Sequence, residues 1–279
     1  MAYTAEISRN SPSCFLFLID QSGSMAESFP GDAAKKKADG VADAINKLLQ
    51  NLVIRCAKEE GVRDYFNVCV VGYGASVGPG FGGNLAGKEL APISEIANFP
   101  ARIDERTKKV DDGAGGLVDQ KVKFPIWFEP TASGGTPMCQ AINAAKSILQ
   151  RWLAQHPNTF PPVVIHITDG ESTDGDPSQA MNDLKNLSSS DGNLLLFNLH
   201  ISGNPNAQST AFPDAASSLP DQYAKLLFEG ASALTPFMRS VASEHGFSLA
   251  EGAKCFVLNA DLVLVIQALD IGTRPSNLR

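Results

Sequence analysis

The chain has 279 residues, 43% of them hydrophobic, and a formal net charge of -7. This length suits one large α/β domain or a domain with insertions, and the composition is that of an ordinary globular protein. The acidic balance argues against a general binder of nucleic acid or of anionic membranes. Residues 1–12 are polar and the apolar run that follows is short, so we expect neither a leader segment nor a membrane span.

An apolar run at residues 14–19 predicts the first buried strand, which ends at Asp20. Ser22 and Ser24 follow on the loop that leaves the carboxyl end of this strand, where open α/β sheets bind their ligands. One carboxylate and two hydroxyls offer only oxygen donors, which hard cations such as Mg2+ prefer. This loop is therefore a candidate for part of a metal site, to be completed by oxygens from other strand ends.

A long helix is expected over residues 33–57, with Asp32 as its N-cap and the lysines at 35–37 on its solvated side. Its core face repeats at helical spacing through Val41, Ile45, Leu48, Leu49, Leu52 and Cys56. A second strand is predicted at residues 66–71. The order strand, long helix, strand suggests the start of a Rossmann-like sheet, with an antiparallel hairpin edge as the alternative.

The segment of residues 74–133 is longer than a connection between two elements of the sheet needs to be. Glycines crowd the segment after Gly72, but their spacing does not match a dinucleotide-binding loop and no helix follows. A strand is expected at residues 121–128. Because long irregular loops are uncommon unless functional, we predict an insertion of strands or short helices on the rim near the metal site, and a candidate surface for a partner.

Thr136 and Pro137 predict the start of the next helix, with Thr136 as N-cap and proline at the first position. A third buried strand is expected at residues 163–168, ending at Asp169. His166 lies inside this strand, and we interpret it as a hydrogen-bonded core histidine. The helix has one apolar face, made of Ala141, Ile142, Ala145, Ile148, Leu149, Trp152 and Leu153.

An acidic loop at residues 171–177 lacks the spacing of an EF-hand. Asp174 and Asp176 either tune the field of the bound cation or cap turns and helices. The other predicted elements are a helix at 178–187, a strand at 194–201, helices at 221–228 and 234–245, an edge strand from 247–249 or 255–257, and a final helix. That helix is capped by 259–261 and directs Leu262, Val265, Ile266 and Leu269 inward.

Asp20, Ser22, Ser24, Thr136 and Asp169, in this order and at strand and helix ends, resemble the metal-ion-dependent adhesion site of the von Willebrand factor A (VWA) family. The resemblance covers most of the chain. It implies a Rossmann-like, doubly wound, mostly parallel sheet with helices on both faces. It also implies a single domain over 1–279, with a core at about 12–272 and an insertion at about 74–133.

In that family, the two serines bind Mg2+ directly, the threonine binds directly or through water, and the aspartates act largely through water. The resemblance carries these roles to Ser22, Ser24, Thr136, Asp20 and Asp169. The last ligand of the ion is typically a Glu or Asp carboxylate of a partner protein. The implied function is a non-catalytic, Mg2+-dependent protein-binding module, with Mn2+ or Ca2+ as alternative ions.

Two other functions are open. One is a Mg2+-dependent phosphohydrolase of haloacid-dehalogenase type with Asp20 as nucleophile, although Ser22 stands where that family has a second acid. The other is an assembly protein that uses the fold without metal. Among VWA proteins, the chain resembles the intracellular bacterial TerY-like type, which implies stress, defence or signalling roles and kinase/phosphatase partners. The type that works beside AAA+ ATPases carries extensions that we do not find here.

Five cysteines lie scattered in apolar segments without Cys-x-x-Cys spacing, namely Cys14, Cys56, Cys69, Cys139 and Cys255. We expect them to be buried, reduced thiols, with disulfides or a zinc site as the alternatives. Reduced thiols favour a cytoplasmic location.

Overall fold

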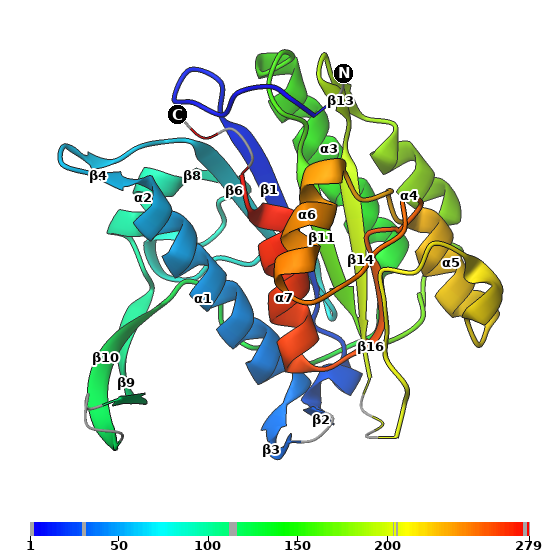
Figure 1. Ribbon diagram of the computed structural model, residues 1–279, viewed down its shortest axis with the longest axis horizontal. Coiled ribbons are helices and arrows are strands. Elements are labelled where there is room, and N and C mark those ends of the chain that lie inside the picture. Colours follow the sequence, from blue (N-terminus) through cyan, green and yellow to red (C-terminus); the bar gives the residue numbers. More distant parts are fainter. Residues whose placement is uncertain are drawn as a thin grey trace.

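A mostly parallel sheet forms the centre of the protein (Figure 1), seen in a computed structural model that describes residues 3–29, 32–111, 116–202, 204, 206–275 and 278. The strand order is β15-β16-β14-β11-β1-β6-β7, and β8 also pairs with β6. The parallel strands are β1 (Ser13–Asp20), β6 (Phe66–Tyr73), β11 (Val163–Thr168), β14 (Leu195–Ile201) and β16 (Phe256–Ala260). The antiparallel ones are β7 (Val77–Pro79), β8 (Ala91–Pro92) and β15 (Thr210–Ala211).

The sheet has its topological switch point between β1 and β11. After β1 the chain adds β6 on one side, and it then returns to add β11, β14 and β16 on the other side. All eight residues of β1 are buried, as expected for a strand with neighbours on both sides and helices on both faces. In open α/β sheets, ligands bind in the crevice at the carboxyl ends of the strands where the order reverses. Here the switch point lies between the loops that follow Asp20 and Thr168, and we call the site between these two loops the crevice.

Helices cover both faces of the sheet, so the expected mixed α/β class with a mostly parallel sheet is confirmed. α7 packs on β11, β14, β16 and on the neighbouring helices α1 and α6, whereas α3, α4 and α5 follow one another on the other face (Figure 1). The helices are α1 (Lys37–Cys56), α2 (Ile93–Asn98), α3 (Met138–Gln155), α4 (Ser178–Lys185), α5 (Gln222–Gly230), α6 (Pro236–Glu244) and α7 (Leu262–Thr273). No helix among the described residues is both long and apolar enough to span a membrane.

Helix α1 begins later than the sequence predicts. Residues 32–36 form strand β3 (Asp32–Lys36), which pairs with β2 (Ser28–Phe29), so Asp32 is not the N-cap. The backbone N–H of Lys37 donates to the carbonyl of Glu27 at 2.8 Å, which closes this small hairpin before the helix starts. The lysines at 35–37 are therefore not one solvated group, because Lys37 is buried.

The segment predicted as an insertion contains β7, β8, α2 and a long arm made of β9 (Arg102–Asp111) and β10 (Leu117–Ile126). The strand expected at 121–128 thus begins four residues earlier and ends two earlier, and residues 102–111 before it also form a strand. In Figure 1 the arm extends from the body beside α1. The remaining short strands form two pairs, β4 (Ala57–Lys58) with β5 (Gly61–Val62) and β12 (Ser188–Ser189) with β13 (Gly192–Asn193). Two 3-10 turns are η2 (Gly83–Leu85) and η3 (Ala216–Ser218).

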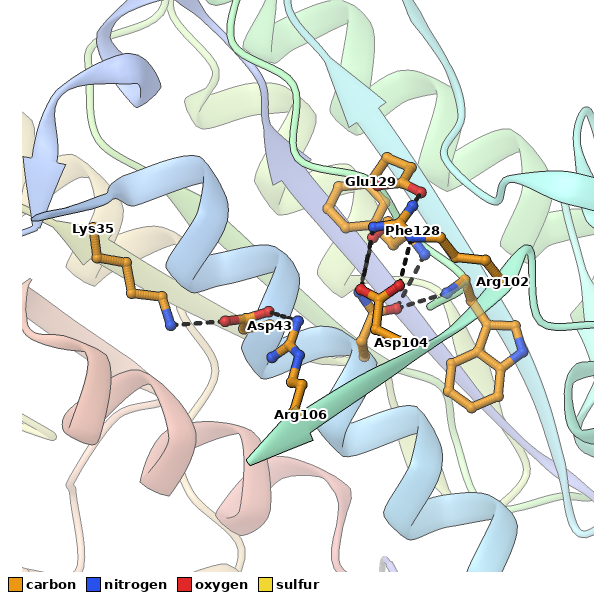
Figure 2. A network of polar contacts seen from close by, with 9 residues as sticks. Lys35, Asp43, Arg102, Asp104, Arg106, Phe128 and Glu129 are labelled. Atoms are coloured by element: carbon orange, nitrogen blue, oxygen red, sulfur yellow. Dashed lines mark hydrogen bonds and ion pairs between the residues drawn. The ribbon is translucent and has the colours of Figure 1, made fainter. Parts of the chain in front are cut away.

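An ion pair between Arg106 and Asp43 joins the arm to α1, as Figure 2 shows. Asp43 of α1 lies between Lys35, at 2.7 Å, and Arg106 of β9, at 2.8 Å. Burial alone would raise the pKa of Asp43, but the hydrogen bonds from Arg106 and Lys35 outweigh burial and lower it. Arg102 pairs with Asp104 and with Glu129, which follows the arm. The arm is thereby tied to the helix that starts beside the crevice.

Near the carboxyl terminus, the last strand is Phe256–Ala260, and residues 247–249 form no strand. Asp261 caps α7 as predicted, accepting a hydrogen bond from Leu264 N at 2.8 Å. Val265 and Leu269 are buried, but the prediction for Ile266 was wrong, because its side chain is 48% exposed. The cysteines are all free, and only Cys139 is partly exposed.

Candidate metal centre

Asp20 is the last residue of β1 and is held from two sides. Its Oδ1 accepts a hydrogen bond from the backbone N–H of Ser22 at 2.8 Å, which folds the loop back over the strand end. Its Oδ2 accepts from the hydroxyl of Thr168, at 2.8 Å, on the neighbouring strand β11. Burial raises the pKa of Asp20, and these hydrogen bonds only partly oppose the effect. A bound cation beside this carboxylate would stabilise its charged form.

The two serines connect the first loop to the second acid. Ser22 lies just before the 3-10 turn η1 (Gly23–Ala26), which contains Ser24. The hydroxyls of Ser22 and Ser24 are 3.0 Å apart, and Ser24 Oγ donates to Asp169 Oδ1 at 2.7 Å. Met25 is fully buried and anchors the turn in the core. Oxygen atoms from two loops, at the ends of β1 and β11, therefore lie within hydrogen-bond distance of one another.

The loop that carries Thr136 is brought to the first loop by backbone contacts. Ser133 N donates to Gln21 O at 2.7 Å, and Gly23 N donates to Gly134 O at 3.0 Å. These contacts need a glycine at position 74, because a Cβ there would lie 2.5 Å from Gln21 O and 2.6 Å from Ser133 O. Close backbone approach of this kind is a typical reason for glycine near a site.

Thr136 itself is buried and held by Thr173. Thr136 N donates to Thr173 Oγ1 at 3.0 Å, and Thr173 N donates to Thr136 O at 2.9 Å. Its hydroxyl would lie 3.9 Å from a Cβ built at Gly170, the residue after Asp169. The prediction that Thr136 is the N-cap of α3 and Pro137 its first residue was wrong, because the helix starts at Met138 and Pro137 holds the N-cap position. The Cys139 and Gln140 N–H groups donate to Asp174 instead, both at 2.9 Å.

The acidic loop serves local structure. Asp174 caps α3, and its pKa is lowered because hydrogen bonds from the Gln140 and Cys139 N–H groups outweigh its partial burial. Asp176 Oδ1 accepts from Ser178 N at 2.8 Å, at the start of α4. Of the two readings of these acids, the capping of helix starts is therefore the one that their contacts bear out.

A buried polar chain supports the sheet beneath the site. Asn198 donates through Nδ2 to Leu227 O at 2.7 Å, which leaves its Oδ1 to accept from Nδ1 of His166 at 3.0 Å. In this tautomer, His166 Nε2 accepts from the hydroxyl of Tyr73 at 2.6 Å. Burial lowers the pKa of His166 to about 4, so the ring is neutral at pH 7. His166 is a satisfied core histidine, as predicted.

Sequence reasoning missed Lys37. Its side chain is 2% exposed, and its Nζ lies 2.5 Å from Asp169 Oδ2 and 2.9 Å from Glu27 Oε2. A signal was present in the chain, because Lys37 is four residues before Val41 and so continues the core face of the helix. Because Lys37 follows two other lysines, it was interpreted as part of one solvated group.

The donor set suits a hard cation. The five predicted residues bring two carboxylates and three hydroxyls, and oxygen-only sets of this kind bind Mg2+ or Ca2+, with water completing the shell. Among the described residues, no group of three or more His, Cys, Asp and Glu side chains could hold a metal ion. Any ion here would therefore depend on the serine and threonine hydroxyls, and the residues present fit such an ion.

Three solved structures that are similar to this chain come from pilus tip proteins. No family model matches the chain, and no curated protein matches it. Similar solved structures include the three N-terminal domains of the type V pili tip protein Mfa5 from Porphyromonas gingivalis, at 13% identity and TM-score 0.32, covering 58% of this chain and 20% of that chain. Another is the vWF domain of the same protein, at 12% identity and TM-score 0.28, covering 58% and 39%.

A further similar structure is the adhesive tip pilin GBS104 from Group B Streptococcus agalactiae, at 15% identity and TM-score 0.32, covering 87% of this chain and 72% of that chain. The chain thus spans about a fifth of the first Mfa5 structure. The class that the fold defines is a mixed α/β protein with a cluster of oxygen-bearing side chains at the switch point of its sheet. The strand order and the contacts of these side chains define this class, and the similarity does not.

Proposed function

We propose that this chain is a VWA protein with a metal-ion-dependent adhesion site, and that it is a non-catalytic module which binds Mg2+ and captures an acidic residue of a partner protein. One observation carries the proposal: the hydrogen-bonded run from Ser22 through Ser24 to Asp169, which gathers oxygens from two strand ends at the switch point. Mn2+ and Ca2+ are alternative ions for the same donors.

In this proposal, Ser22, Ser24 and Thr136 hold the ion through their hydroxyls, and Asp20 and Asp169 balance its charge largely through water. When bound, the ion supplies a coordination position that an anionic oxygen can fill. The protein's own groups do the orienting. Ser22 N and Thr168 Oγ1 fix Asp20, and the backbone contacts of residues 133 and 134 place the loop of Thr136.

The cysteines and the loop after β11 bear on the cellular setting. The five free thiols suit a reducing compartment, so we propose a cytoplasmic protein. The sequence from Thr168 to Glu171 resembles the TerY-like type, and we propose a kinase/phosphatase system as the source of the partner.

Metal titration and capture test this function together. Calorimetry should give one Mg2+ site in the wild type, and Mg2+ at 100 times its Kd should stabilise the fold by about 2.7 kcal/mol. Immobilised protein should recover a partner from lysate in Mg2+ but not in EDTA. Ser22→Ala should lose both properties, whereas Ser147→Ala, an exposed serine of α3, should keep them. Equal recovery with and without metal would refute the adhesion-site function.

The phosphohydrolase alternative has a separate test. Asp20 would need a general acid two residues later, where the hydroxyl of Ser22 instead contacts Ser24. We expect no hydrolysis of phosphate esters by the purified protein in Mg2+. Hydrolysis that disappears in Asp20→Asn would overturn the binding-module function in favour of the phosphohydrolase.

A further inference from the structure

Lys37 carries a buried positive charge beside the proposed metal site. It is the first residue of α1, and its side chain is 2% exposed. Its ammonium lies 2.5 Å from Oδ2 of Asp169, a side chain that is itself fully buried. A second acid, Glu27, lies 2.9 Å from the same ammonium but is 65% exposed. Because water screens Glu27, Asp169 is the main counter-charge of Lys37.

Asp169 is shared between two groups. Its Oδ1 accepts the hydroxyl of Ser24, which belongs to the oxygen cluster, whereas its Oδ2 faces Lys37. Among the described residues, no group donates a well-aligned hydrogen bond to this buried Oδ2. The ammonium therefore stabilises Oδ2 mainly through charge, and a buried carboxylate without such a counter-charge is strongly unfavourable.

The charge balance of the crevice depends on this lysine. Asp20 and Asp169 bring two negative charges, and Lys37 removes one of them. A divalent ion would then leave the loaded site with one net positive charge, whereas the same site without Lys37 would be neutral. A net positive charge beside the partly exposed Ser24 attracts an anionic group and disfavours a cationic one.

We propose that Lys37 is a built-in counter-cation of Asp169, which lets the crevice fold without metal, weakens its affinity for divalent ions and gives the loaded site its preference for an acidic partner. This inference rests on the proposed function, since it concerns the same donor set. The lysine is too buried to touch a partner, so it acts through its charge on the site and not as a contact residue.

The test removes the charge and measures the metal directly. Lys37→Met and Lys37→Gln are titrated with Mg2+ by calorimetry and melted with and without Mg2+. A neighbouring unit charge changes the binding of another charge by about tenfold or more, so both variants should bind Mg2+ at least about tenfold more tightly than the wild type. Their melting temperature should fall without Mg2+ and recover when it is added.

Two variants serve as controls. Lys35→Met removes a lysine of the adjacent strand that pairs with Asp43 and not with the site acids, and it should leave the Mg2+ affinity unchanged. Lys37→Arg keeps the charge and should bind Mg2+ like the wild type. Lys37→Gln keeps a hydrogen-bond donor toward Asp169, so it decides the question if Lys37→Met does not fold in either condition.

The outcomes separate this inference from the proposed function. If the wild type binds Mg2+ and neither neutral variant binds it more tightly, the proposed role of Lys37 is overturned and the metal-dependent function stands. If only the neutral variants bind Mg2+, the counter-cation is supported and the metal-dependent function of the natural chain is overturned. If none of the proteins binds Mg2+, both are overturned.

Discussion

Ser24 and Asp169 are 145 residues apart in the chain, yet Ser24 Oγ donates a hydrogen bond of 2.7 Å to Asp169 Oδ1. The contact joins the loop after β1 to the loop after β11, across the switch point of the sheet. It gives the crevice a defined donor geometry before any ion is present. Preorganised ligands of this kind lose little conformational entropy on binding.

Ser24→Ala should weaken Mg2+ binding at least about tenfold, because it removes both a hydroxyl ligand and the hydrogen bond that orients Asp169. The partly exposed position should limit the loss of folding free energy to about 1 kcal/mol. Calorimetric titration gives the affinity, and urea denaturation in EDTA gives the stability. An unchanged Mg2+ affinity would remove Ser24 from the donor set.

Gly74→Ala should separate the two loops that carry Ser22 and Thr136. The new methyl group would lie within 2.6 Å of both Gln21 O and Ser133 O, and these backbone atoms have to move. We expect about 1–3 kcal/mol of destabilisation and a clear loss of Mg2+ affinity. The control is Gly78→Ala in β7, where an added Cβ meets nothing within 4 Å. Equal affinities of the two variants would contradict the role of this close approach.

Asn46→Ala should loosen the base of the arm. The buried Asn46 Oδ1 accepts from the N–H groups of Trp127 and Phe128, at 2.8 and 3.0 Å, and its Nδ2 donates to Phe128 O at 2.8 Å. Leaving these buried groups unpaired should cost about 3 kcal/mol. Urea denaturation measures the loss, and limited proteolysis of the arm should become faster.

The control for this variant lies one helical turn away. Gln50→Ala removes a partly exposed side chain of α1 that donates to Lys123 O at 3.4 Å. Its effect should stay within about 0.5 kcal/mol. If Gln50→Ala loses as much folding free energy as Asn46→Ala, the buried hydrogen bonds of the Asn46 amide do not explain the destabilisation.

The free energy of unfolding should decrease as the pH drops, because of His166. The folded chain holds the pKa of this ring at about 4 by burial, against 6.5 for the free side chain. Between these two values the unfolded chain binds a proton that the folded chain does not, so stability is full above pH 6.5 and declines as the pH drops toward 4. The loss amounts to about 3 kcal/mol.

Urea denaturation of the wild type and of His166→Gln, from pH 7.5 to pH 4.5, checks this dependence. The variant is less stable at pH 7.5, because Tyr73 and Asn198 lose a matched partner, but its stability should fall less steeply over the range. Parallel curves for the two proteins would show that the histidine does not titrate as described.

Local patterns were sufficient for most of the fold. Continuous apolar runs at residues 14–19 and 163–168 predicted β1 and β11 closely, and the spacing of Ala141, Ile148 and Trp152 predicted the buried face of α3. Such patterns work because strands and helices repeat over two and about 3.6 residues. They fail at boundaries, where distant groups decide. Asp174 caps α3 from another loop, and the hairpin of β2 and β3 delays the start of α1.

Oxygen-bearing side chains at the strand ends can be recognised from the amino-acid sequence, since an apolar run that stops at an acid is a local property. Three features require the folded chain: Ser24 contacts Asp169, Gly74 allows two loops to touch, and Lys37 is buried against Asp169. The physical reason is that charges and hydroxyls act over a few ångströms of space, and separation along the chain says little about that distance.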